Sequence, residues 1–388
     1  MPRRTVQTSE RAYVFSPDRA PLQADRIQVL AKVRLIDELT SQAPAGPSLM
    51  KTPLKNVSAR IGADGIGGVI GIPRTVFPAL NAQPYTIHLA VISEGYVTQE
   101  LDLTVQADPS FPAAFSPPAL VDVFLHRKPT IIRGRTIRAN GVTTIPMPGA
   151  TVRVTGIWRT SPPANASVPP SAPNLVSLRP PLYASRKAIV GHLGRRNLPA
   201  LAGNKFLLED VLQGATEIRL SDQVSLAVGT ILLIDAGDPD LIEFIAIKTI
   251  TGAGTADQPC TVSFVQPLAF EHRRNAVVQR ANPLAPAPTK QVSVEALAGD
   301  ICVFLSSTSG LTAEVEVSGG SANEYHRVST FSVTSDSDGY YRLPPLSRVA
   351  QLVIEGKKTV GPQTFAAKTE FRPDYSKREN TLDLMLSV

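Results

Sequence analysis

Two aspartates near the C-terminal end of the chain have the spacing of oxygen ligands. Asp336 and Asp338 stand in the stretch SDSDG, which lies between two strand-like runs. A complete calcium loop needs further carboxylates downstream, but two tyrosines and a leucine follow instead. Asp-Gly between strands is the strongest short-range signal of a β-hairpin, because glycine accepts a positive φ and aspartate caps its own backbone. We predict that Asp336, Asp338 and Gly339 form a structural turn and bind no metal.

The histidines and cysteines show no metal-ligand spacing. Since the histidines lie in separate segments, we expect each to be an exposed or hydrogen-bonded surface residue. Acids stand close to two of them, in Glu271-His272 and Glu324-Tyr-His326, but neither pair has a nucleophile or third partner nearby in sequence. Cys260 and Cys302 are expected to be reduced core or strand residues, and a structural disulfide is the alternative. The five histidines are His88, His126, His192, His272 and His326.

Other catalytic and binding motifs are missing from the sequence. There is no Gly-x-Ser-x-Gly elbow and no Walker loop, and the glycine-rich stretch GADGIGGVIG has Ile70 where a dinucleotide fingerprint needs its third glycine. The net charge of +6 comes from scattered Lys and Arg without interleaved aromatic residues, so no nucleic-acid partner is expected. We predict a protein that is not an enzyme and has no catalytic residue, cofactor or metal.

The N-terminus has no apolar leader, and no run of about 18 apolar residues occurs in the sequence. We therefore expect a chain made in the bacterial cytoplasm without a signal peptide and without insertion into a membrane. Its 388 residues suit two or three domains, and 34 prolines argue against long helices.

Alternating apolar residues predict a first β-sandwich at 25–127, after an N-terminal arm at 1–24. Ile27, Val29, Ala31, Val33 and Leu35 fall on one face of a strand, and Gln28, Lys32 and Arg34 fall on the other. The same period of two returns in three further runs, with turn residues in the gaps. These runs are 85–91, 101–105 and 121–125.

A second strand-rich unit begins at residue 128 and breaks off after 158. A Pro-rich connector follows at 159–204, of which the part from 160 to 184 should be unable to pair as a central strand. A short helix is expected near 206–212. Five short strand-like runs then predict an inserted β module at 205–281, either a small barrel or a sandwich. A return segment with strands spans 282–329.

Two separated stretches resemble one known family when they are joined. IIRGRTIRANGVTTIPMPGATVRVTG and TSDSDGYYRLPPLSRVAQLVIEGKKTVGP are similar to the carboxypeptidase regulatory-like, or transthyretin-like, family of seven-stranded sandwiches. The resemblance implies that 128–158 and 330–388 form one split sandwich, with Val152 and Val154 buried opposite Leu352 and Ile354. That family domain is a non-catalytic accessory domain, so the resemblance implies no peptidase activity.

Two further similarities complete the predicted architecture. VDVFLHR at 121–127 and LDLMLSV at 382–388 look like equivalent closing strands of two related sandwiches, and chance similarity is the alternative. The inserted module resembles a short β module of bacteriophage and phage-tail-like structural proteins, from its Gly-Ala start to its PLAF ending. The predicted fold is all-β: two tandem Ig/transthyretin-like β-sandwiches, the second interrupted by a small β-barrel or β-sandwich module.

We expect a structural or adaptor component of a phage-tail-like particle, either a contractile injection system or a phage virion. Its position would be a cap, collar, baseplate or fibre attachment, with other subunits as partners and with multiple copies or a homo-oligomeric ring. A carbohydrate- or surface-binding adhesion protein with Trp158 as a stacking platform is one alternative, and an assembly chaperone is another. The candidate assembly contacts are Arg3, Arg4, Pro162, Pro163, Pro169 and Pro170.

Overall fold

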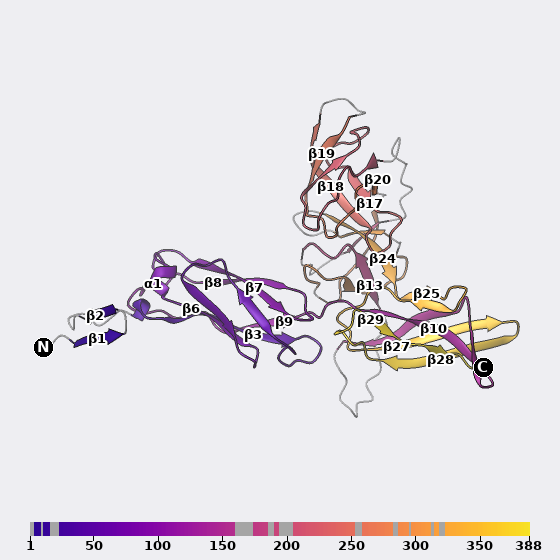
Figure 1. The fold of residues 1–388 in the computed structure, drawn as a ribbon, viewed down its shortest axis with the longest axis horizontal. Coiled ribbons are helices and arrows are strands. Elements are labelled where there is room, and N and C mark those ends of the chain that lie inside the picture. The colour runs from indigo at the N-terminus through magenta and orange to yellow at the C-terminus, as the bar shows by residue number, and fades with distance from the viewer. Residues whose placement is uncertain are drawn as a thin grey trace. The chain divides into compact units, whose positions relative to one another are not determined.

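A computed structural model gives the fold, which is all-β (Figure 1). The chain divides into two compact units, Met1–Lys128 and Pro129–Val388. No helix of the described residues is both long and apolar enough to cross a membrane. The structure describes residues 4–8, 11–15, 23–159, 174–184, 190–193, 205–252, 258–281, 286–294, 296–311, 314–317 and 323–388.

The first unit contains a two-layer sandwich and, within the predicted arm, an antiparallel pair of strands. The pair is β1 (Arg4–Thr8) with β2 (Arg11–Phe15). Apolar side chains of the two layers share one core, in which Val33, Val69, Ile87 and Leu103 are buried. One sheet has the order β5 (Val57–Ile61), β6 (Ile66–Gly71), β3 (Gln28–Asp37) and β9 (Val121–Leu125), and the other has β4 (Ser48–Lys51), β7 (Tyr85–Ser93) and β8 (Gln99–Val105).

The alternation predicted for the first strand is correct only in part. Ala31, Val33 and Leu35 are buried, but Ile27 is 73% exposed and Leu30 is fully buried. The pairing of β3 with β6 shifts between Val29 and Ala31, which marks a β-bulge. Because a bulge adds one residue to one strand, it reverses the faces on which the residues before it lie.

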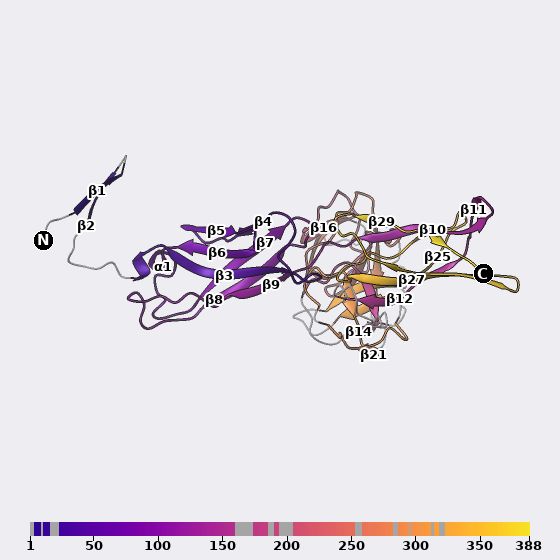
Figure 2. The ribbon, with the colours of Figure 1, turned by 90° about the horizontal axis from the view of Figure 1, so that it is seen from below.

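The second unit contains a sandwich built from both ends of its sequence (Figure 2). β10 pairs with β11, β26, β29 and β30, whereas β12 and β27 lie in the other layer with β25 and β28. The strands are β10 (Ile131–Asn140), β11 (Thr143–Pro146), β12 (Thr151–Trp158), β25 (Ser332–Thr334), β26 (Tyr340–Arg342), β27 (Gln351–Val360), β28 (Gln363–Phe371), β29 (Glu379–Thr381) and β30 (Leu384–Met385).

The predicted packing of two valines against the partner segment needs correction. Val152 and Val154 are buried, but Val154 is the direct neighbour of Ile354 within one sheet. They therefore do not face each other across the sandwich. The other layer supplies Ile132 and Tyr341 to the same core.

The proposed closing strands occupy equivalent places in the two sandwiches. β9 pairs in parallel with β3, the first strand of its sandwich. β30 pairs in parallel with β10, the first strand of the second sandwich. The shared topology is what a duplication would leave, since all other pairs in these two sandwiches, apart from β29 with β10, are antiparallel.

Parts of the Pro-rich connector and of the return segment combine into a six-stranded sheet. Its order is β21 (Pro286–Lys290), β14 (Val190–Leu193), β23 (Glu314–Val317), β24 (Glu324–Thr330), β13 (Leu175–Arg179) and β22 (Cys302–Phe304). The expectation that 160–184 cannot supply a central strand is wrong, because β13 lies between β24 and β22. Its five residues contain no proline, so each can donate its amide to the sheet.

The inserted module at 205–281 is a closed six-stranded barrel. Leu208 N donates to Arg219 O at 3.1 Å and Ser221 N donates to Phe206 O at 3.0 Å, which joins the first and last strands of the sheet. The predicted helix near 206–212 is wrong, because the chain pairs there as part of the barrel wall. The strand order is β15 (Lys205–Phe206), β20 (Val277–Ala281), β17 (Ile231–Ile234), β18 (Glu243–Gly252), β19 (Cys260–Phe264) and β16 (Glu217–Leu220).

Candidate functional site: a buried carboxylate–histidine network

The SDSDG stretch is a tight turn between two layers. Asp336 Oδ1 accepts hydrogen bonds from Asp338 N at 3.0 Å and Tyr340 N at 2.8 Å, and Gly339 has φ 77. The strands on either side do not pair with each other, because β25 belongs to the sheet of β12 and β26 belongs to the sheet of β10. The expected hairpin is therefore wrong in topology, since the turn carries the chain from one sheet to the other.

The candidate assembly contacts lie almost entirely outside the described residues. Arg3 and the prolines at 162, 163, 169 and 170 are outside them, and Arg4 is described only as the first residue of β1. Trp158, the candidate stacking platform, is the last residue of β12 and is half-buried beside Gln351. This position is within a sheet rather than on a loop.

The expectation of surface histidines is wrong for three of the five. His126, His272 and His326 are 4%, 1% and 0% exposed, whereas His88 is exposed. His192 lies in β14, whose side chains are outside the described part of the structure. Burial is tolerated because His126 lies 3.5 Å from a carboxylate oxygen of Glu38, and the other two join a larger network.

Glu243 is the centre of that network. It is the first residue of β18 and is fully buried. Its Oε2 lies 3.0 Å from His272 Nε2, and its Oε1 accepts hydrogen bonds from Ala269 N at 2.6 Å and Tyr183 OH at 2.5 Å. On the other side of the ring, His272 Nδ1 lies 2.7 Å from Asp235 Oδ2. His272 is thus held between two carboxylates inside the unit.

Tyr183 connects the barrel to the six-stranded sheet. Its hydroxyl reaches Glu243 of the barrel, and its backbone N donates to Glu324 Oε2 of β24 at 2.9 Å. His326, two residues along β24, places Nε2 3.3 Å from the same oxygen and Nδ1 2.9 Å from Pro180 O. Both β24 side chains are fully buried, so the network lies between the two modules.

The electrostatics of the network favour a charged His272. Burial by itself would lower the pKa of His272, but the hydrogen bonds to Glu243 and Asp235 outweigh it and raise that pKa above its usual value of 6.5. Burial and the neighbouring charge of Glu243 raise the pKa of Tyr183, so its hydroxyl stays a donor. The resulting arrangement is an imidazolium between two carboxylates, with a neutral tyrosine bonded to one of them.

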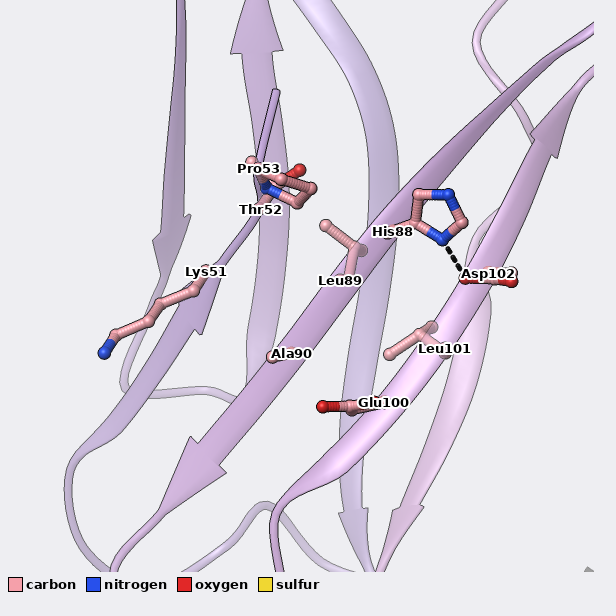
Figure 3. A pocket seen from close by; sticks show the side chains of 9 residues that line it. All are labelled: Lys51, Thr52, Pro53, His88, Leu89, Ala90, Glu100, Leu101 and Asp102. Atoms are coloured by element: carbon pink, nitrogen blue, oxygen red, sulfur yellow. Dashed lines mark hydrogen bonds and ion pairs between the residues drawn. The ribbon is translucent and has the colours of Figure 1, made fainter. Parts of the chain in front are cut away.

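A surface groove is the second candidate, on the first unit (Figure 3). It has a volume of about 500 Å³ over β7 and β8, with Lys51 and Pro53 on one side. His88 Nδ1 lies 2.6 Å from Asp102 Oδ1, and both side chains are more than half exposed. No Trp, Tyr or Phe side chain lines this hollow, so it lacks the large stacking surface that a carbohydrate site uses.

The chemistry of both places is limited. Within the described residues, no group of three His, Cys, Asp or Glu side chains is arranged to hold a metal ion. Glu243, His272, Glu324 and His326 are buried, and in the groove His88 is bonded to a carboxylate rather than to a nucleophile. The buried network links the barrel to the six-stranded sheet through Tyr183.

Sequence reasoning identified only part of this network. Glu324 and His326 were recognisable as a pair, because residues two apart share one face of a strand. Glu271 is exposed and is not the partner of His272. The true partners, Glu243 and Asp235, are brought close only by strand pairing, and the one local signal was a glutamate at the start of the apolar run EFIAI.

Comparisons with known proteins add little to this picture. No protein-family model and no curated protein matches the chain. A solved structure of protocadherin gamma B7 extracellular cadherin domains 1–4 is 9% identical, over 89% of this chain and 100% of that one, with a TM-score of 0.12. The protocadherin gamma B4 extracellular domain is also 9% identical, over 91% of this chain and 65% of that one, with a TM-score of 0.11.

Proposed function

We propose that the chain is a non-enzymatic structural or adaptor subunit of a phage-tail-like particle, either a contractile injection system or a phage virion. The observation that carries the proposal is the position of the buried carboxylate–histidine network. His272 contacts Glu243, and Tyr183 connects Glu243 to Glu324, so these buried groups lie between modules of the same chain. Groups placed in this way hold modules together and leave no site for turnover.

The architecture also suits a subunit that makes several contacts. Its strand-rich modules present sheet edges, such as the outer side of β8, which pairs only with β7 among the described strands. Unpaired edges and flat sheet faces are surfaces on which neighbouring subunits can dock. In a symmetric ring, repetition multiplies a modest contact into a firm attachment.

The test uses the tagged full-length chain in the bacterium that encodes it. We expect it to sediment with particles and to be present in several copies in each. A variant that lacks 161–172, which carry all four candidate prolines, should fold with unchanged thermal unfolding but leave the particle fraction. The double charge reversal Arg3→Glu and Arg4→Glu should weaken incorporation.

The matched control replaces Arg74 by Glu, because Arg74 is an exposed arginine of the one-turn helix α1 (Pro73–Val76) and is not among the candidate assembly contacts. This variant should incorporate normally. A wild-type chain found only as a monomer that binds a glycan or turns over a substrate would overturn the proposal.

A further inference from the structure

The barrel and the six-stranded sheet meet over a small apolar contact. Outside the barrel core, Ile231, Leu233, Ile242, Phe244 and Ala281 form a cluster of their own, and Tyr325 of β24 packs against it. This cluster is much smaller than the cores of the sandwiches. The carboxylate–histidine network therefore provides a large part of the contact between the two modules.

The hydrogen-bond partners of His272 require a proton on each of its two ring nitrogens. Both ring nitrogens lie within hydrogen-bond distance of carboxylate oxygens, at 2.7 Å to Asp235 and 3.0 Å to Glu243. A carboxylate can only accept, whereas a neutral imidazole has one donor and one acceptor nitrogen. The neutral ring would therefore set a lone pair against one of the two carboxylates.

Asp235 is held in position by its backbone. It has φ 50, a left-handed conformation that non-glycine residues seldom adopt, and its carbonyl accepts from Asp238 N at 2.9 Å. Its carboxylate is 21% exposed and can be hydrated, but the carboxylate of Glu243 is fully buried. Loss of the imidazolium would thus leave Glu243 as a buried anion without a counter-charge.

Among the residues that the structure describes, the other charged groups near the network do not replace that charge. From the sheet, Glu324 adds a third buried carboxylate and His326 lies beside it, and Tyr183 stands between Glu324 and Glu243. Arg179 stacks over Phe270 at 5.6 Å and faces Asp240 at 3.9 Å.

We propose that His272 is a proton-controlled latch: its doubly protonated ring keeps the barrel docked on the six-stranded sheet, and loss of one proton releases the barrel. The direction of the pH dependence follows from the geometry. The docked state is favoured below the usual His pKa of 6.5, and undocking begins as the pH rises through the raised pKa of His272. The latch does not depend on the function proposed above.

The test is hydrogen–deuterium exchange of the full chain at about pH 6 and about pH 9, corrected for the intrinsic pH dependence of exchange. At the higher pH we expect exchange of peptides from 240–246 and 324–330 to rise about tenfold, which corresponds to a tenfold larger open population. Peptides of the β27–β28 hairpin should keep their protection. A general loss of fold would raise exchange in all three regions.

Three variants complete the test. His272→Gln should leave the two contact regions open at both pH values, and His88→Gln, which changes an exposed His–Asp pair, should behave like the wild type. If His272→Gln does not fold, Glu243→Gln tests the latch instead. Removal of the buried anion should keep the contact between the barrel and the sheet closed at high pH. Equal exchange at both pH values in the wild type, or an unchanged pH response in Glu243→Gln, would overturn the latch.

Discussion

Arg153 donates two hydrogen bonds to one carboxylate oxygen of Glu355, from Nε at 3.0 Å and from Nη2 at 2.8 Å, although the two residues are 202 positions apart. The pair lies on the outer face of β12 and β27, above a core that contains Val154 and Ile354. The two ends of the second unit therefore fold as one sheet, and the chain between them forms the other modules.

The insertion of other modules between the two halves of one sandwich predicts different outcomes for two deletions. Replacement of 205–281 by a short Gly-rich linker should leave a cooperatively folding protein, because β15 and β20 are paired neighbours and the two cut ends lie close together. Replacement of 160–328 by a similar linker should leave a protein that no longer unfolds cooperatively. It removes Leu175, Ile301 and Phe304 from the sandwich core.

The larger deletion also removes Asp300, which lies 2.5 Å from the buried guanidinium of Arg348. Breaking a buried ion pair by removal of one partner costs about 3–5 kcal/mol. Circular dichroism during thermal unfolding, together with limited proteolysis, compares the two proteins. Equal cooperativity in both would show that the insertion contributes nothing to the sandwich.

The turn at Gly339 predicts a steric effect that is independent of calcium. At φ 77, a Cβ would lie 2.7 Å from Thr136 O and 3.2 Å from Met147 N. Gly339→Val should therefore lower the free energy of unfolding by about 1–3 kcal/mol. Urea unfolding followed by the fluorescence of Trp158, which lies in the same sandwich, measures the change.

Gly361→Val is the matched control for this substitution. Gly361 also has a positive φ, 58, but nothing lies within 4 Å of its added Cβ, so this variant should lose less stability than Gly339→Val. Calcium should change the melting temperature of neither protein. A stabilisation by calcium that a chelator removes would show that Asp336 and Asp338 bind the ion.

Local patterns predicted strands better than they predicted strand partners. The five runs of the inserted module all became strands of the barrel, because period and β-branched content are properties of a few consecutive residues. The bulge at Leu30 and the central position of β13 could not be predicted in the same way. Both depend on which strand lies alongside, and that is decided by distant residues.

The buried network was hidden for the same reason. A histidine beside Glu271 in sequence gave no indication that its ring would meet Asp235 and Glu243, which precede it by 37 and 29 positions. The Pro-rich stretch at 160–173 lies outside the described residues, so the prediction that it contacts neighbouring subunits stays a prediction.

The two cysteines should be unreactive in the folded protein. Both are free and buried, in separate modules. Burial raises the pKa of Cys302 to about 11 and also raises the pKa of Cys260, so little thiolate is present near neutral pH. An aromatic disulfide reagent should titrate two thiols in denaturant and almost none without it. Rapid reaction of the native protein would mean that one of these modules opens readily.

Acid should weaken the first unit through Asp37. This carboxylate is buried, accepts from Tyr96 OH at 2.8 Å, and lies 2.5 Å from Arg127 Nη2. Burial by itself would raise the pKa of Asp37, but the hydrogen bonds from Arg127, Leu39 N and Tyr96 lower it below its usual value. Because the folded pKa is the lower one, the stabilisation is present above the unfolded pKa and is lost as the pH falls through the folded value.

Arg127→Met should therefore destabilise the first unit by about 1–3 kcal/mol near neutral pH, because a buried carboxylate loses its charged donor. The difference from the wild type should shrink below about pH 4, where Asp37 becomes protonated in the variant first. Urea unfolding of residues 1–128 at a series of pH values, followed by circular dichroism, measures both effects. Arg34→Met is the control, because Arg34 and Asp122 form an exposed pair whose loss should have little effect at any pH. A constant difference between Arg127→Met and the wild type across the pH series would show that Arg127 stabilises the unit by packing rather than by its charge on Asp37.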